Sequence, residues 1–199
     1  MAMATGKRNS LTAGDWAAAA LDALAHGGLA AVAVEPIAKV LGTTKGSFYW
    51  HFADRNALLE ATLALWERRD TELVIASVDD SRDAATRLRR LLRLAFSSVR
   101  DTSAAPTGTV ELALQANASH PLVRPTLERV TRRRLAFLTK LYTDVGAPQA
   151  RAADRALLAY SAFLGHAQLA HATPELLPRG RAFTRHVDRV VEALAELGG

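Results

Sequence analysis

Several features are absent from this chain of 199 residues, and their absence limits the classes of protein to which it can belong. It has no cysteine, which excludes disulfide bonds and thiolate chemistry. It has no run of about 18 apolar residues, so we expect no membrane-spanning helix. The first ten residues, MAMATGKRNS, lack the apolar stretch of a secretory signal. These absences predict a cytoplasmic protein with no membrane partner.

The arrangements of residues that support catalysis are also missing. The six histidines are scattered, no second ligand follows His51 at metal-site spacing, and there is no glycine-rich phosphate loop. We therefore expect no enzyme activity, no metal and no cofactor.

Composition and charge describe a globular protein but do not by themselves indicate its partner. Apolar residues make up 49% of the chain and charged residues 23%, which is sufficient for a substantial core. The net charge is +5, yet residues 1–55 contribute only +1, from five Lys and Arg against four Asp and Glu. Residues 121–155 contribute +5, from eight against three, and include Arg132, Arg133 and Arg134. Such a run is usually a solvated helix face, so net charge is weak evidence for DNA binding.

Hydrophobic periodicity predicts an all-α protein, because each extended segment repeats with a helical period and none alternates with period two. Thr12 and Asp15 form a variant of the capping box that opens the first helix, and Gly27 and Gly28 close it. About nine helices follow from such signals. Their expected ranges are 12–27, 35–41, from 43 or 44 to 50 or 51, 54–78, 82–100, 110–118, from 121 or 125 to 146, 148–171 and 180–197.

The second and third helices are separated by one short turn that contains Gly42. This is the spacing of a helix-turn-helix, in which the second helix lies in the major groove of DNA. Within the stretch TTKGSFYWHF, Phe48 and Phe52 are four residues apart and are expected to face the core. Thr44 and Ser47 then face outward, with Lys45 beside them. The candidate DNA-binding residues are Thr43, Thr44, Lys45, Gly46, Ser47, Tyr49, Trp50, His51 and Arg55, with partial packing as the alternative for Trp50.

Residues 11–60 resemble the DNA-binding head of the tetracycline-repressor (TetR) family, on the segments IAKVLGTTKGSFYWHF and ADRNALLEA. The resemblance implies that Tyr49 and His51 hold phosphates and that the residues from Thr44 to Ser47 face the groove. It also implies a dimeric body with a ligand cavity. One departure is Ala33, where the family usually caps the second helix with threonine or serine. We place the DNA-binding domain at residues 10–56 and the ligand-binding and dimerisation domain at 57–199.

Two helices near the C-terminus supply the candidate dimer interface. The last helix carries an apolar seam with 4-3-4-3 spacing, and the helix before it carries a mixed face beside a glycine that permits close approach. The alternative for the seam is packing within one protomer. The seam comprises Phe183, Val187, Val190, Leu194 and Leu197, and the preceding face comprises Leu157, Ser161, Leu164, Gly165 and Gln168.

Polar and aromatic residues inside apolar helices are the candidates for a ligand pocket, although each is more often a core or surface residue. The first choices are Phe96, Gln115, Phe137, Tyr142 and His166, within a wider set that adds Glu111, Asn117, Tyr160, Phe163 and His171. The predicted function is a homodimeric repressor that an apolar small molecule releases from a palindromic operator in double-stranded DNA. The alternatives are an activator of the same fold, and a DNA-binding or architectural protein without a ligand.

Overall fold

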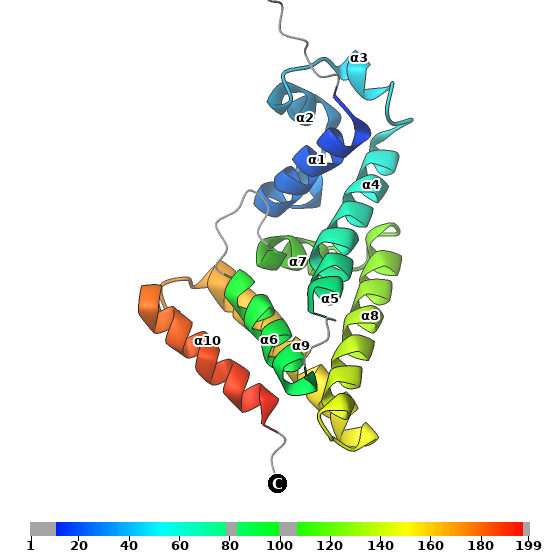
Figure 1. The fold of residues 1–199 in the computed structure, drawn as a ribbon. Coiled ribbons are helices and arrows are strands. Elements are labelled where there is room, and N and C mark those ends of the chain that lie inside the picture. Colours follow the sequence, from blue (N-terminus) through cyan, green and yellow to red (C-terminus); the bar gives the residue numbers. More distant parts are fainter. Residues whose placement is uncertain (1–10, 79–82, 100–106, 197–199) are drawn as a thin grey trace, which may run out of the picture.

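The computed structural model describes residues 11–78, 83–99 and 107–196, and within them every regular element is helical (Figure 1). Two short elements accompany ten α-helices: the 3-10 turn Leu29–Ala31, called η1, and the π-helical turn Arg68–Glu72, called η2. The α-helices are α1 Ala13–Gly27, α2 Val34–Val40, α3 Lys45–Phe48, α4 Arg55–Glu67, α5 Leu73–Val78, α6 Ala84–Ser98, α7 Thr107–Gln115, α8 Val123–Asp144, α9 Gln149–Ala172 and α10 Gly180–Ala195.

The segments α4, η2 and α5 follow one another without a break and form a single rod of residues 55–78. Counted with this rod as one helix, the described elements match the nine predicted helices. None of the described helices is both long and apolar enough to cross a lipid bilayer.

The ends of the head helices follow the local signals of the sequence. At the start of α1, Thr12 Oγ1 accepts from the Asp15 amide at 3.2 Å, and the Asp15 carboxylate accepts from the Thr12 amide at 2.7 Å. This is the predicted capping box. The helix α2 begins after Ala33 with no side-chain cap, as expected. After α2, Gly42 adopts a φ of +64°, a left-handed conformation that glycine tolerates best, and the chain turns into α3.

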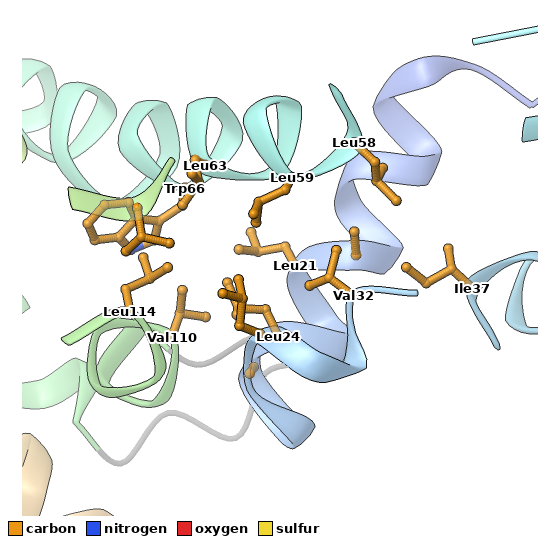
Figure 2. Packing of buried hydrophobic residues seen from close by; sticks show 14 of the residues in the cluster. Leu21, Leu24, Val32, Ile37, Leu58, Leu59, Leu63, Trp66, Val110 and Leu114 are labelled. Atoms are coloured by element: carbon orange, nitrogen blue, oxygen red, sulfur yellow. The ribbon is translucent and has the colours of Figure 1, made fainter. Parts of the chain in front are cut away.

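The core of the head is built on aromatic contacts and extends beyond the head itself. Phe48 is fully buried, and its ring centroid lies 5.3 Å from that of Trp16 and 5.5 Å from that of Phe52. Figure 2 shows Leu59 and Leu63 of the rod beside Leu21 of α1, with Leu114 of α7 close to Trp66. The same buried cluster therefore joins the head to α7 and to the start of α8.

The rod passes from this first core into a second one. Trp66 belongs to the first cluster, whereas Ile75 and Val78, beyond η2, belong to the second. Ion pairs hold the rod against α8: Arg129 contacts Glu67 at 2.6 Å and Arg133 contacts Glu72 at 3.3 Å. Much of the positive charge of α8 is thus balanced by acidic residues of the rod rather than left as a free basic face.

Part of the seam of α10 packs on the core of its own protomer, which was the alternative to a dimer interface. The helix lies alongside α6 in Figure 1, with Val187 and Val191 buried in the second core. The partly buried Phe183, Val190 and Leu194 pack against the same cluster. The α6 helix therefore takes up part of this apolar face within the chain, and the contribution of Phe183, Val190 and Leu194 to a dimer interface stays a prediction. Leu197, also assigned to the seam, lies outside the described residues.

Substituting Val191 by alanine should lower the free energy of unfolding by about 2 kcal/mol, since it removes a fully buried side chain and leaves a cavity. Val190→Ala is the matched control on the same helix. Val190 is only partly buried, so its substitution should cost less than half as much. Urea denaturation of both variants measures the difference. Equal losses would mean that α10 is turned differently on α6.

Candidate functional site

The recognition helix α3 is shorter than predicted and continues as a series of turns. Only Lys45–Phe48 is α-helical. Beyond it the Trp50 amide donates to the Ser47 carbonyl at 3.4 Å, and the His51 amide donates to the Phe48 carbonyl at 2.9 Å. These three-residue spacings tighten the chain because Phe48 and Phe52 both turn into the core. The structure therefore presents the segment after Phe48 as a compact turn.

The predicted DNA-contacting residues share the outer surface of this turn, apart from Arg55. The most exposed is Trp50, with 87% of its surface accessible, followed by Tyr49 at 56%. Thr44, Lys45 and Gly46 are exposed, and Thr43, Ser47 and His51 are half-buried. Thr44 also caps α3, because its hydroxyl accepts from the Ser47 amide at 3.4 Å. An aromatic side chain as exposed as Trp50 contributes little to the core, which favours contact with a partner over packing.

Lys45 is held by Glu35 of α2 in the free protein. The Lys45 ammonium lies 2.9 Å from the Glu35 carboxylate, and both side chains are more than half exposed. The hydrogen bond between them raises the pKa of Lys45 and lowers the pKa of Glu35. Exposed pairs of this kind are weak, so Glu35 positions the lysine without preventing it from reaching a base.

Arg55 has a role different from the one predicted. It was expected to offer a cation to the DNA backbone. Instead its Nε donates to the Val32 carbonyl at 2.6 Å, and its Nη2 donates to the Leu29 carbonyl at 2.7 Å. These bonds add side-chain donors to carbonyls at and just after the 3-10 turn η1, between α1 and α2. Arg55 thus joins the start of the rod to the rest of the head.

The second candidate site is a cavity of about 130 Å³ in the body, between the rod, α6, α8 and α9. Its walls are mostly aliphatic and aromatic, with a few polar groups contributed by the rod and by α8. Phe96 and Phe137, both predicted, lie in its wall, as do Tyr160 and Phe163 of the wider set. The complete lining is Asp70, Thr71, Val74, Ile75, Leu91, Leu92, Leu94, Ala95, Phe96, Ser98, Arg134, Phe137, Leu138, Ala159, Tyr160 and Phe163.

Three of the first-choice pocket residues do not line this cavity. Tyr142 is fully buried and donates to the Leu194 carbonyl at 2.9 Å, tying α8 to α10. Burial raises its pKa to about 12. His166 faces His186 instead, and Gln115 donates to Glu111 at 3.2 Å and borders a separate groove between α7 and α8. Each of these three polar groups has a partner within the fold, and their contact with a ligand stays a prediction.

Three residues of the wider set, Glu111, Asn117 and His171, are also absent from the cavity lining. Asn117, just beyond the end of α7, donates from Nδ2 to the Ala113 carbonyl of that helix at 2.8 Å. His171 is exposed near the end of α9.

The polar end of the cavity is organised by Arg134, which the sequence reasoning missed. Its guanidinium donates to the Glu111 carboxylate at 2.6 Å, to Thr71 Oγ1 at 2.9 Å and to the Asp70 carbonyl at 3.3 Å. The Tyr160 hydroxyl donates to the other Glu111 oxygen at 3.1 Å. We call these five residues the Arg134 clamp. It joins η2 to α7, α8 and α9.

Neighbouring groups of the clamp keep the Arg134 guanidinium ionised. Burial by itself lowers the pKa of Arg134, but the neighbouring Glu111 and Tyr160 outweigh that effect, and its pKa is raised. Burial and the Glu111 charge both raise the pKa of Tyr160, which remains a neutral donor. The signal for Arg134 was present in the sequence. It occupies the apolar stripe of α8, three residues before Phe137 and four after Val130.

A three-helix head with an exposed recognition turn, set on a helical body that contains an apolar cavity, is the fold of helix-turn-helix transcriptional regulators. Residues 17–62 match the model of the family described as bacterial regulatory proteins, tetR family. No curated relative matches the chain in sequence.

Solved structures share the fold over nearly the whole chain. A transcriptional regulator from Rhodococcus sp. Rha1 superposes with a TM-score of 0.76 at 20% identity, covering 92% of this chain and 96% of its own. A TetR-family regulator from Streptomyces coelicolor gives 0.67 at 21% identity, with 98% of each chain covered. FadR from Bacillus subtilis, in complex with stearoyl-CoA, gives 0.67 at 15% identity, covering 92% and 97%. At these identities the similarity establishes the fold.

Tyr49→Phe and His51→Ala should weaken binding to all DNA sequences alike, because hydrogen bonds to phosphate carry no sequence information. The loss for His51→Ala should come with a shallower dependence on salt if the imidazole is charged beside a phosphate. Fluorescence anisotropy with specific and random duplexes at several salt concentrations measures both effects. Wild-type affinity of either variant at moderate salt would remove that residue from the interface.

Lys45→Ala should relax sequence preference at one base pair, with a loss there of about 1–3 kcal/mol, because a lysine at the start of the recognition helix can reach guanine acceptors. Selection of binding sites from a random library, with wild type and variant in parallel, tests this. Glu35→Gln is the control that frees the lysine without removing it, and it should keep the wild-type preference. Identical preferences for wild type and Lys45→Ala would limit Lys45 to phosphate contact.

Proposed function

We propose that the protein is a homodimeric repressor that a small apolar ligand releases from a palindromic operator. The observation that carries this proposal is the position of the cavity on the rod. Thr71, Val74 and Ile75 line the cavity, and the same rod begins at Arg55, directly after the recognition turn. A ligand that alters the rod at η2 therefore alters the element on which the head is built.

Release follows from differential affinity. In the DNA-bound dimer, two recognition turns must read successive faces of the major groove about 34–36 Å apart. A second conformation of the body, with the rod in another position, would hold the heads at a different spacing. A ligand that binds this conformation more tightly than the DNA-binding one shifts the population toward it. Operator affinity can then fall by up to the ratio of the ligand affinities of the two conformations. The π-helical geometry of η2 supports such a change, since π-turns inside helices occur frequently at functional sites.

The cavity favours a compact apolar ligand. At about 130 Å³ it is smaller than most ligand pockets and comparable with engineered cavities that hold one benzene ring. The Arg134 clamp already satisfies its own donors and acceptors, so an apolar molecule leaves no buried group unpaired. FadR of Bacillus subtilis, a structural neighbour, is complexed with stearoyl-CoA, which supports an acyl chain as a second ligand type if the cavity widens.

The two rival functions are addressed by different observations. An architectural DNA-binding protein without a ligand needs no cavity, so the cavity favours the ligand-controlled regulator. An activator would use the same head, cavity and dimer. Reporter transcription with and without the operator-bound protein distinguishes activation from repression.

The exposed face of α9 is the surface we propose for dimerisation. Leu157 and Leu158 are 56% and 59% exposed, and Leu169 is 45% exposed, which forms an apolar surface unusual for a solvated helix. Gly165 lies between them, and a side chain added there would meet nothing within 4 Å. The predicted Ser161 and Gln168 are also exposed on this helix, whereas Leu164 is half-buried. A second copy of α9 can approach closely at Gly165.

Ala159→Leu should abolish release by ligand while operator binding remains, because the larger side chain fills part of the cavity from α9. The assay first identifies, by a thermal-shift screen, a compound that releases wild type from its selected operator. The variant should then require ~10-fold more compound or fail to respond. Ala153→Leu, at an exposed position of the same helix, should respond like wild type. Unchanged release of Ala159→Leu would place the ligand elsewhere.

Leu158→Glu should yield a monomer, because a carboxylate buried without a partner at the α9 face is unfavourable. The head contributes little net charge of its own, so the monomer should bind operator ~10-fold more weakly or worse. Light scattering gives the mass, circular dichroism confirms retained helix, and anisotropy gives affinity. Ala64→Glu, an exposed position on the rod, serves as the control and should remain dimeric. A dimeric Leu158→Glu would exclude this face.

A further inference from the structure

Two histidines from different helices meet end to end between α9 and α10. The Nε2 atoms of His166 on α9 and His186 on α10 are 3.0 Å apart, and the ring centroids are 5.3 Å apart. The two Nε2 atoms therefore point at each other along the line between the rings. Both side chains are half-buried, and neither lines the cavity.

A second hydrogen bond decides which ring donates. His166 Nδ1 lies 2.9 Å from the Ala162 carbonyl oxygen. A carbonyl oxygen only accepts, so Nδ1 of His166 carries the hydrogen, and Nε2 of the neutral ring carries the lone pair. His186 Nε2 then donates its hydrogen to His166 Nε2. The contact is a single N–H···N hydrogen bond in which each ring has one fixed role.

These roles determine what added protons do to the contact. A proton on His166 binds at Nε2 and removes the acceptor, so that two N–H groups face each other. A proton on His186 binds at Nδ1 and leaves the hydrogen bond in place, but it puts a charge on a half-buried ring. Protons on both rings place two cations against each other. The contact therefore tolerates one added proton at most.

The α9 and α6 sides of the pair offer no carboxylate to a protonated ring. Residues 156–172 of α9 and 84–98 of α6 contain no Asp or Glu. The α6 side chain that packs edge-on against His166 is Phe96, with ring centroids 5.0 Å apart. An added proton on His166 thus meets an uncharged ring rather than an ion-pair partner.

The α10 side adds a cation. Arg189 opposes a charge on His186, and the acidic neighbour Asp188 is paired with Arg93 of α6 at 3.0 Å. Burial, His166 and Arg189 together lower the pKa of His186 below its ordinary value of 6.5. The folded protein therefore favours the neutral form of this ring.

We propose that the His166–His186 hydrogen bond is an acid-sensitive latch between α9 and α10, closed while both rings are neutral and open when both are protonated. The direction of the effect follows from linkage. A histidine that is harder to protonate in the folded state contributes stability that is complete above pH 6.5 and is lost as the pH falls through the lowered pKa. The competing arrangement is a hydrogen bond that persists unchanged through this range.

Opening the latch would affect the first half of α10. Further along that helix, Val191 is buried in the second core, and Tyr142 of α8 donates to the Leu194 carbonyl at 2.9 Å. These contacts carry no histidine and persist in acid. The latch itself lies beside Phe96 of the cavity wall, so acid would loosen α10 next to this wall. The latch requires no ligand and is independent of DNA binding.

The test is a double-mutant cycle on the full-length protein at pH 7.5 and pH 5.0. Urea unfolding of wild type, His166→Leu, His186→Leu and the double variant gives the coupling between the two side chains, because leucine forms no hydrogen bond. At pH 7.5 the coupling should favour the folded state by ~3-fold or more in the unfolding constant, the size expected for one neutral hydrogen bond. At pH 5.0 it should vanish or change sign.

His171→Leu is the matched control, since this exposed histidine lies on the same helix, five residues beyond His166. It should lose the same stability as wild type between the two pH values. Equal coupling of His166 and His186 at pH 7.5 and pH 5.0 overturns the proposal.

Nitrogen-15 NMR of the imidazoles in wild type gives an independent measurement that requires no substitution in the pair. At pH 7.5 His166 should be the Nδ1–H tautomer and His186 the Nε2–H tautomer. On acidification, His186 should take up its proton below pH 6.5. The opposite tautomer of His166, or protonation of His186 at or above pH 6.5, would show that no such latch exists.

Discussion

The rod of residues 55–78 is the constraint on which the rest of the structure depends, because it belongs to both hydrophobic cores. Its first half packs with Trp66 in the core that the head shares with α7, and its second half packs with Ile75 in the body. Between the halves, the guanidinium of Arg134 binds Thr71 and the Asp70 carbonyl on the inner side of the π-helical turn, and Arg133 pairs with Glu72 on its outer side. Breaking a buried pair such as Arg134 and Glu111 leaves an uncompensated charge, which is strongly unfavourable. The junction is therefore held by hydrogen bonds that fix its register, whereas the cores on either side are held by apolar contact.

The sequence determined the head well because its signals are local. The capping box at Thr12, the left-handed turn at Gly42 and the inward pair of Phe48 and Phe52 each depend on neighbours within a few residues. The body depends on long-range pairing. The apolar face of α10 could be recognised, but nothing in its spacing distinguishes a partner protomer from α6 of the same chain. Similarly, the role of Arg134 depends on Glu111 in another helix, so in sequence it looked like one more arginine in a solvated run.

Charge in this molecule is used chiefly to fasten helices to one another. The surplus on α8 is directed at the acidic residues of the rod, through Arg129 with Glu67 and Arg133 with Glu72. The recognition surface, in contrast, has one lysine that is held by Glu35 and a highly exposed tryptophan. In the proposed dimer, DNA affinity would depend less on long-range attraction than on two heads binding together, since their contributions combine through an effective concentration. Operator affinity would therefore be more sensitive to the spacing of the two heads than to their charge.

The hydrogen-bonding groups of the Arg134 clamp are paired with one another, and this has an evolutionary consequence. Because Glu111, Thr71 and Tyr160 already satisfy the guanidinium, the polar end of the cavity is not required to recognise any particular molecule. Chemical selectivity is left to aliphatic and aromatic wall positions such as Leu91 and Phe137, where hydrophobic exchanges of similar volume are tolerated at small cost. Under the proposed function, single substitutions at those wall positions would change the effector, while the junction that links body and head is inherited unchanged.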